Sequence, residues 1–308
     1  MYVFLDTETT GGQEIKNKET FITIEGMSVE NGVEHRICQL AFITDDGKTM
    51  EAYDEMCQPP VKMSVSAAAV TGITPEALYG KPTFDKTQAA QKLMEINKSE
   101  NFLVIHNAAF DLEMLRREGF TSEMKLIDTL RVARHVLQDD ERHSLQWQRY
   151  AKKLYLHEPA LVEKVGKEVK AHDALSDVIV LKLFYDYLKS FLSDDKMVEL
   201  TAAPIIYKRL TFGKYAGEDL VDVVKKDSGY LMYMLGNELA KDDKRDVDMV
   251  LTMRHHLLNE EGSVTVNFGK YKDRPLGDLL EDTGYIDWMK TMENKSPNIL
   301  AILNLAEE

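Results

Sequence analysis

The sequence lacks the features that mark membrane-spanning and secreted proteins. Its 308 residues contain no run of about 18 consecutive apolar residues, the approximate minimum for a membrane-spanning helix. The N-terminus has no basic segment followed by an apolar stretch and a small-residue cleavage site, so we expect no secretion signal. We therefore expect a cytoplasmic protein without a membrane partner.

Cysteine is also scarce. Cys38 and Cys57 are the two cysteines of the chain, too few for a disulfide framework or a cysteine-based zinc site. We expect both to be reduced thiols in or near the core.

Positive charge is in deficit. The chain has 52 Asp and Glu against 38 Lys and Arg, a net charge of −14. This balance argues against a protein that coats polyanions in general. It leaves room for a nucleic-acid enzyme that acts locally and uses divalent metal to offset its own carboxylates. The length allows a large core and more than one domain.

Five short segments have the composition of β-strands, and helical patterns follow the later ones. The first three strands are expected to form an antiparallel meander with a tight turn at residues 45–48. The last two are each followed by a helix, so the pattern predicts an α/β domain with a mixed sheet. The expected strands are residues 2–8, 35–43, 49–56, 102–105 and 125–128. The expected helices are 64–70, a short one from 74, 85–97, 109–118, a helix through 136, 145–153 and 173–190.

An internal repeat occupies the C-terminal third. The letters FGKY occur at residues 212–215 and again at 268–271, and DSGY at 227–230 recurs as DTGY at 282–285. Each copy predicts a small hairpin followed by a helix, so we expect small α+β repeats. The predicted division is a domain at 1–192, a linker at 193–209, a first repeat with a connecting helix at 210–262 and a second repeat at 263–308.

Two interpretations of the repeats stay open. The favoured one is a miniature core with turns. The other is a surface for single-stranded nucleic acid, or for a polymerase or repair partner, because basic and aromatic groups alternate there. The residues concerned are Lys214, Tyr215, Lys270, Tyr271, Lys272 and Arg274.

Four carboxylates are candidates for one site. Asp6 and Glu8 are two apart on the first strand and so point to the same face. Asp111 opens the helix after strand 102–105, and Asp177 lies in the last helix of the domain, five residues after His172. Taken singly, these residues have ordinary explanations: a solvated strand end, a helix N-terminal charge and a surface histidine.

Taken together, the residues predict metal-dependent chemistry. Oxygen ligands without cysteine or clustered histidine favour Mg²⁺ or Mn²⁺ over zinc. Two such ions about 3.5–4 Å apart can activate a water and stabilise the leaving oxygen of a phosphodiester. A histidine that titrates near neutral pH can take the proton of that water.

Three segments resemble, in order, the motifs of the DEDDh family of 3′–5′ exonucleases. They are residues 6–11 (DTETTG), 106–111 (HNAAFD) and 172–177 (HDALSD). The resemblance spans residues 1–190 and implies a ribonuclease H-like fold, with a mixed five-stranded sheet flanked by helices. The repeated segments are similar to the small C-terminal domain of exodeoxyribonuclease X-like proteins. The segment at 13–34 is longer than is usual in the family.

The resemblance implies a role for each matching residue. Asp6, Glu8, Asp111 and Asp177 would bind two Mg²⁺ or Mn²⁺ ions, and His172 would be the general base. The residues implied to contact the terminal nucleotide are Thr7, Thr9, Thr71, Gly72, His106, Asn107 and Phe110.

The predicted function is metal-dependent 3′–5′ exonuclease activity that releases nucleoside 5′-monophosphates. Single-stranded 3′ ends are the expected substrate, and DNA is favoured over RNA. One alternative is a 3′–5′ exoribonuclease of the ribonuclease T or oligoribonuclease type. The other is a non-catalytic subunit that binds nucleic acid or a polymerase.

Overall fold

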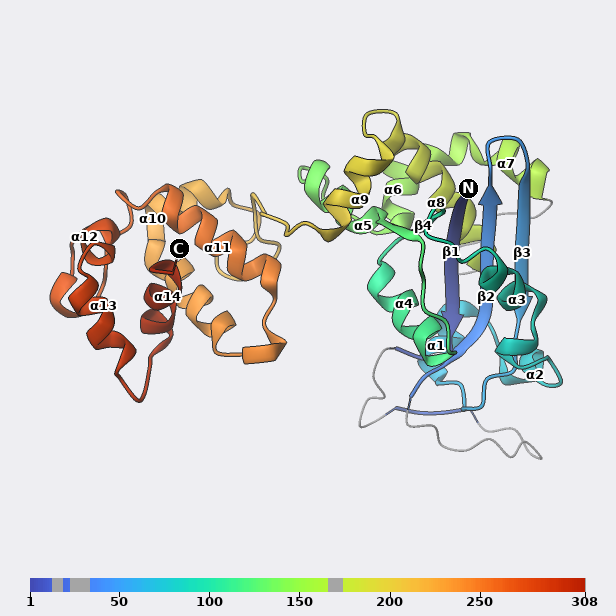
Figure 1. Ribbon diagram of the computed structural model, residues 1–308, viewed down its shortest axis with the longest axis horizontal. Coiled ribbons are helices and arrows are strands. Elements are labelled where there is room, and N and C mark those ends of the chain that lie inside the picture. The colour runs from blue at the N-terminus through green and yellow to red at the C-terminus, as the bar shows by residue number, and fades with distance from the viewer. Residues whose placement is uncertain (13–18, 23–33, 166–173, 308) are drawn as a thin grey trace. The chain divides into compact units, whose positions relative to one another are not determined.

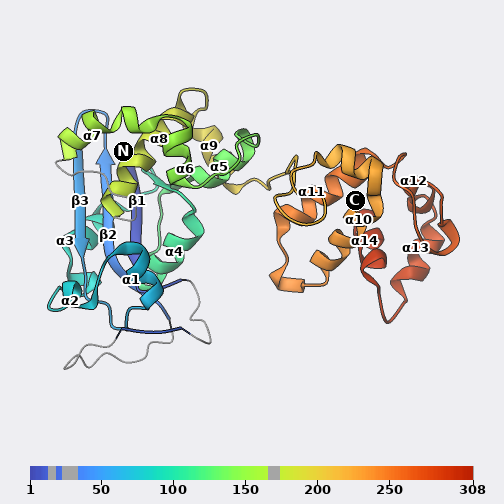
Figure 2. The ribbon, with the colours of Figure 1, turned by 180° about the vertical axis from the view of Figure 1, so that it is seen from behind.

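The computed structural model describes residues 1–12, 19–22, 34–165 and 174–307. The chain divides into two compact units. The first contains Met1–Ala133 and Asp139–Ala202, and the second contains Arg134–Gln138 and Ala203–Glu308. The first unit holds the sheet and the second is helical (Figures 1 and 2).

The first unit is built on a mixed five-stranded sheet, as the sequence predicted. The strand order is β3-β2-β1-β4-β5. The first three strands pair antiparallel, whereas β4 and β5 run parallel to β1. The strands are β1 (Tyr2–Thr9), β2 (Ile37–Asp45), β3 (Met50–Met56), β4 (Phe102–Ile105) and β5 (Lys125–Asp128).

The alternation along β1 assigns its side chains to two different environments. Val3 and Leu5 belong to the apolar core formed with helices α3 (Gln88–Glu95) and α4 (Ala108–Arg117). The intervening Phe4 points to the other face, where its ring lies 5.2 Å from that of Tyr185 on helix α8 (Ala174–Lys189). Asp6 and Glu8 continue the row begun by Phe4, and so they face α8.

Most of the remaining helices of the first unit agree with the predicted pattern, but the 3₁₀ turn at Leu154–Leu156 and the helix at Glu158–Val165 were not predicted. The expected helix at 85–97 begins as a 3₁₀ turn, η1 (Phe84–Lys86), before α3. The other elements of this unit are α1 (Val65–Thr71), α2 (Pro75–Leu78), α5 (Thr129–Val136, whose last turn from Arg134 belongs to the second unit), α6 (Leu145–Ala151), η2 (Leu154–Leu156), α7 (Glu158–Val165), α8 (Ala174–Lys189) and α9 (Asp194–Ala202).

The linker predicted at 193–209 is partly wrong. Its first half is α9, which packs against β5 and belongs to the first unit. The Asp194 carboxylate accepts hydrogen bonds from the hydroxyls of Tyr2 and Tyr185 and pairs with Lys189. Asp194, one of the polar residues that suggested a linker, therefore anchors the helix to the domain through partners on β1 and α8.

The second unit has one core to which both repeats contribute. The two predicted repeat domains, 210–262 and 263–308, are therefore not separate. Buried residues from both copies, among them Leu231 and Leu276, pack in the same cluster. Its elements are α10 (Leu220–Leu239), η3 (Asp242–Lys244), α11 (Val247–Asn259), η4 (Gly269–Tyr271), α12 (Leu276–Leu280), α13 (Thr283–Lys290) and α14 (Pro297–Leu305). No described helix of either unit is both long and apolar enough to span a bilayer.

Single bridges replace the hairpins that were predicted for the repeats. The described part of each copy has one isolated antiparallel bridge, Arg209↔Asp219 in the first and Thr265↔Pro275 in the second. The copies also share a break in their helices. Asp227 has non-helical dihedral angles inside α10, and the corresponding Asp282 separates α12 from α13.

The first FGKY motif makes a specific local packing arrangement. Gly213 has a φ of +82°, and a Cβ there would lie 2.2 Å from the hydroxyl oxygen of Tyr230. That hydroxyl accepts a hydrogen bond from the Lys214 backbone N–H. The Asp227 carboxylate accepts from Lys214 Nζ and from the Tyr215 hydroxyl, both at 2.8 Å.

The second motif repeats this arrangement. A Cβ at Gly269, where φ is +67°, would lie 2.6 Å from the Tyr285 hydroxyl oxygen. Asp282 accepts from Lys270 Nζ at 2.7 Å and from the Tyr271 hydroxyl at 2.6 Å. The FGKY letters thus encode a tight turn, a buried tyrosine and an ion pair, which favours the miniature-core interpretation.

Substitution of the motif glycine should destabilise the second unit. The control is Gly217→Ala, at a glycine that is also left-handed but has nothing within 4 Å of its Cβ position. Its free energy of unfolding should fall by roughly 1–2 kcal/mol, the cost of a left-handed backbone for alanine. Gly213→Ala adds the contact with the Tyr230 hydroxyl, so its free energy of unfolding should fall by roughly 1–3 kcal/mol more. Calorimetric unfolding of both variants measures the difference, and equal losses would contradict the packing role of Gly213.

Candidate metal centre

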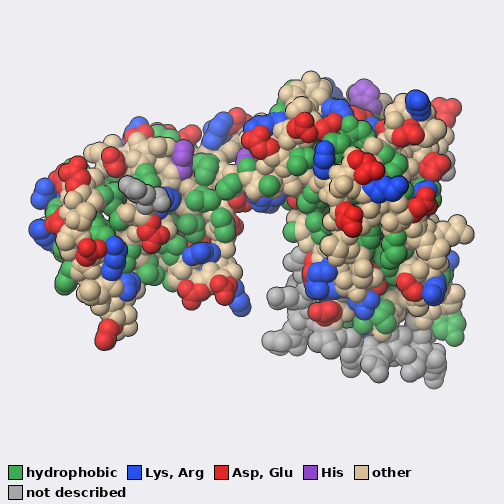
Figure 3. Space-filling view, viewed as in Figure 1, with side chains coloured by type: hydrophobic (Ala, Val, Ile, Leu, Met, Phe, Trp, Pro, Cys, Tyr) green, Lys and Arg blue, Asp and Glu red, His purple; other side chains and the backbone are tan. Residues whose placement is uncertain are grey.

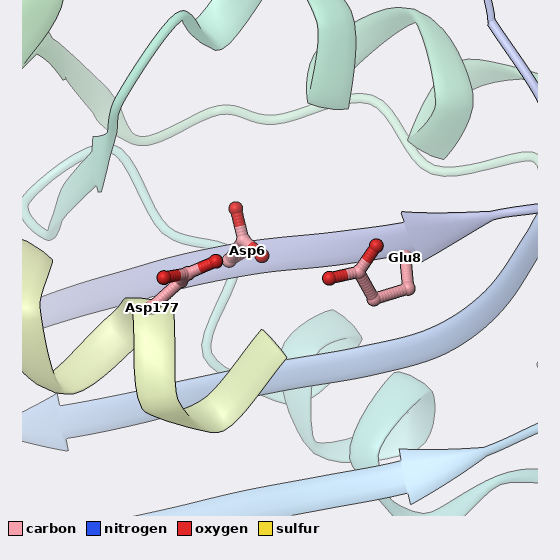
Figure 4. A group of neighbouring side chains, drawn as sticks. All are labelled: Asp6, Glu8 and Asp177. Carbon is pink, nitrogen blue, oxygen red and sulfur yellow. The ribbon is translucent and has the colours of Figure 1, made fainter. Parts of the chain in front are cut away.

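Strand β1 and the first turn of α8 bring three carboxylates together. Asp6 and Glu8 stand on the same face of β1, and Asp177 approaches from α8, as Figure 4 shows. One oxygen of each lies within 4.8 Å of one oxygen of the other two, and all three side chains are half-buried. On the neighbouring strand β2, the small side chain of Ala41 lies opposite Asp6.

The spacing of these oxygens suits one divalent cation. Two ligand oxygens on Mg²⁺ lie at most about 4.2 Å apart, twice the usual bond length of about 2.1 Å. The three oxygens therefore need little movement to share an ion. An all-carboxylate donor set is typical of Mg²⁺ or Mn²⁺ and not of zinc. The residues present thus fit a hard divalent metal.

Asp111 is close to this group but is held differently. Its side chain is 3% exposed, and Oδ1 accepts hydrogen bonds from Thr7 Oγ1 at 2.7 Å and from the Thr7 backbone N–H at 3.1 Å. Burial raises its pKa to about 7, the Thr7 bonds oppose this rise, and the nearby Asp128 adds to it. Among the described residues, the three-carboxylate group does not include Asp111. Asp111 is nevertheless bonded to Thr7, which lies on β1 between the predicted ligands Asp6 and Glu8.

Asp128 positions the helix that carries Asp111. It ends β5, and its two carboxylate oxygens accept from the backbone N–H groups of Asn107 and Ala108, both at 3.0 Å. Oδ1 also accepts from the N–H of Leu130, in the first turn of α5. One buried carboxylate therefore fixes the start of two helices. Asp128 is not among the predicted site residues, although an aspartate immediately before a helix is a recognisable capping signal.

Gln146 is a second residue that sequence analysis did not identify. It lies in α6, and its Nε2 donates a hydrogen bond to Asp177 Oδ1 at 2.6 Å. No pattern in the sequence connects these two positions, because 31 residues separate them.

The predicted nucleotide-contacting residues lie in several elements. Thr7 binds Asp111, and the Thr9 hydroxyl donates to the Gly11 carbonyl at 2.6 Å. Thr71 is the last residue of α1, and Gly72 caps that helix with a φ of +71°.

Three further predicted residues follow β4. The Nδ1 of His106 lies 2.9 Å from the Thr129 hydroxyl oxygen. Asn107 caps α4 in the left-handed conformation, with a φ of +71°, and Phe110 is partly buried against the core. Because β1 and β4 are parallel, their carboxyl ends point the same way, and Thr9 is the last residue of β1 while His106 and Asn107 follow the end of β4.

The predicted general base, His172, lies outside the described residues, as does most of the long segment at 13–34. The described residues beside that segment explain why residue 11 is a glycine. The buried ring of His35 lies 3.1 Å from Thr10 Oγ1 and 3.0 Å from Glu19 Oε2. A Cβ at Gly11 would lie 2.1 Å from that ring.

Comparison with known proteins identifies relatives of this chain. It is 26% identical over 233 residues to exodeoxyribonuclease 10 of Escherichia coli strain K12, and the aligned region covers 74% of this chain and 95% of that protein. It is 28% identical over 142 residues to the PolC-type DNA polymerase III of Clostridium perfringens strain 13, covering 45% of this chain and 8% of the polymerase.

Solved structures with a similar arrangement include two nucleases. Exonuclease X in complex with 5′ overhanging duplex DNA aligns with a TM-score of 0.46 and 21% identity, over 66% of this chain and 100% of that one. E. coli exonuclease I in complex with a dT13 oligonucleotide aligns with a TM-score of 0.41 and 19% identity, over 64% of this chain and 42% of that one.

The family model for exonucleases, RNase_T, matches residues 3–184, which is more than half of the chain. This match confirms the resemblance drawn from the three acidic motifs, and members of the family depend on divalent metal. The chain belongs to the exonuclease family.

Proposed function

We propose that this protein is a divalent-metal-dependent 3′–5′ exonuclease that removes nucleotides from the 3′ ends of DNA and releases nucleoside 5′-monophosphates. The observation that carries the proposal is the convergence of Asp6, Glu8 and Asp177, with oxygens within 4.8 Å of one another. DNA is favoured over RNA because the relatives are an exodeoxyribonuclease and PolC-type DNA polymerases.

The carboxylates are proposed to hold two Mg²⁺ or Mn²⁺ ions. Such a pair of ions activates a water and stabilises the leaving oxygen of an in-line displacement. Asp6 and Glu8 are held in register by β2, which pairs along the full length of β1. Asp177 lies in the first turn of α8, where the helix dipole favours its ionised form. Asp111 would complete the ligand set in its ionised form.

His172 is proposed as the general base. A neutral imidazole can accept a proton from the attacking water and titrates in the physiological range. Its place in the chain, two residues before α8 begins, supports the proposal because Asp177 lies in the first turn of that helix.

Thr9, His106 and Asn107 are proposed to contact the 3′-terminal nucleotide, together with Thr7, Thr71, Gly72 and Phe110. Support comes from the position of Thr9 at the carboxyl end of β1 and of His106 and Asn107 just beyond that of β4. Ligands of open α/β sheets bind in the crevice outside the carboxyl ends of the strands.

The C-terminal unit has less evidence for a nucleic-acid role. Lys214 and Lys270 each pair with an aspartate of their own repeat. On the face drawn in Figure 3, its basic side chains lie interspersed with acidic ones. Binding of a single strand, or of a polymerase or repair partner, by this unit stays a prediction.

Removal of a metal ligand should abolish the activity. Asp177→Ala should reduce Mg²⁺-dependent nucleotide release by roughly 1,000-fold, the equivalent of about 4 kcal/mol of transition-state stabilisation. The matched control is Asp85→Ala, which removes an exposed carboxylate from η1. The rate of mononucleotide release from 3′-labelled single-stranded DNA measures the activity of both variants. Full activity of Asp177→Ala would refute the proposed function.

The sugar preference is tested with single-stranded DNA and RNA of the same sequence, each labelled at the 3′ end. We expect faster release of the labelled mononucleotide from DNA. Labelling the 5′ end of the same oligomers checks direction, because a 3′–5′ enzyme shortens them stepwise before the label is released. Preferential degradation of RNA would instead favour the exoribonuclease alternative.

The role of Asp111 can be separated from its structural bonds. Asp111→Asn keeps an oxygen acceptor for both Thr7 donors, so the free energy of unfolding should stay close to that of the original chain. Asp111→Ala leaves those buried donors unsatisfied and should cost about 1–3 kcal/mol. If the carboxylate binds metal, both variants should lose nuclease activity. An active Asp111→Asn would show that Asp111 has only a structural role.

A further inference from the structure

We infer that Gln146 is a positioning residue for Asp177, orienting its carboxylate toward Asp6 and Glu8 for cation binding. The inference rests on the proposed function. Its direct evidence is the hydrogen bond from Gln146 Nε2 to Asp177 Oδ1, 2.6 Å long, between two half-buried side chains of different helices.

The amide is chemically suited to this position. A carboxylate has two oxygens with about four lone-pair sites, so one amide donor leaves acceptor capacity for a metal ion. An amide also restrains rotation of the carboxylate without adding positive charge. A lysine or arginine at residue 146 would repel the cation that Asp177 is to bind. Metal-binding carboxylates are commonly oriented by such outer hydrogen bonds.

Helix α6 gives Gln146 a fixed base. Gln148, which is fully buried, donates to Asp140 Oδ2 and to the Arg142 carbonyl, both at 3.1 Å. On the other side, Arg149 makes two hydrogen bonds to Glu158 of α7, at 2.6 and 2.8 Å. The backbone that carries Gln146 is therefore anchored both to the loop before α6 and to the helix after it.

Arg149 also sets the direction of the Gln146 amide. Its Nη1 donates to Gln146 Oε1 at 3.4 Å, so the amide nitrogen is left to face Asp177. Glu158, Arg149, Gln146 and Asp177 form a chain of hydrogen bonds in which each group polarises the next. Glu158 balances the guanidinium charge, and the neutral amide separates that charge from the metal ligand.

The test replaces Gln146 with methionine, which has a similar length but no donor. In calorimetric titration of the metal-free full chain, Gln146→Met should bind Mn²⁺ about 10–100-fold more weakly. The Mg²⁺ concentration for half-maximal nuclease activity should rise, and saturating Mg²⁺ should restore most of the rate. The thermal midpoint of the metal-free protein should stay within a few degrees, as a positioning role requires.

The matched control is Gln91→Met, the same change at an exposed position of α3. Gln146→Asn retains the amide but shortens its reach, so it should also weaken Mn²⁺ binding, and it serves as the test if the methionine variant does not fold. If the residue 146 variants match Gln91→Met in Mn²⁺ affinity and Mg²⁺ requirement, the inference fails while the exonuclease proposal stands. If Asp177→Ala also binds Mn²⁺ and degrades DNA normally, the proposed function fails with it.

Discussion

The mutual repulsion of Asp6, Glu8 and Asp177 is the constraint around which the first unit is organised. Oxygens of three carboxylates within 4.8 Å of one another would separate in a flexible chain. The sheet and α8 prevent this, because Phe4 packs against Tyr185 on the same face, directly beside the acidic row. Apolar packing thus maintains a cluster of negative charge that the proposed divalent cation would neutralise.

A second layer of buried and half-buried polar groups holds the surroundings of that cluster. Asp128 binds the N-terminal N–H groups of α4, Asp111 binds Thr7 on β1, and Gln146 binds Asp177 on α8. Each of these bonds crosses between elements that are distant in the sequence. Buried polar groups are costly unless they are paired, so these contacts restrict the helices to one arrangement around the site.

The C-terminal unit contains the same arrangement of hydrogen bonds twice. Asp227 and Asp282 each interrupt a helix and bind the lysine and tyrosine of their own FGKY motif. Both partners of each bond lie within one copy of the repeat, and hence the repeat could be recognised from its sequence motifs. The joining of the two copies in one core depends on apolar side chains that carry no such signature, and for this reason the predicted division into two repeat domains was wrong.

The sequence by itself determined the strands, most helices, the two acidic residues of β1 that are proposed as metal ligands, and the family, because strand alternation and contiguous motifs are local properties. The motifs also predicted that Asp177 joins Asp6 and Glu8, but only the tertiary structure showed how close their oxygens lie, that Asp111 is bonded to Thr7, and that Gln146 reaches Asp177. These are contacts between side chains brought together by sheet pairing and helix packing. Their distances depend on the whole fold, and no spacing along the chain encodes them.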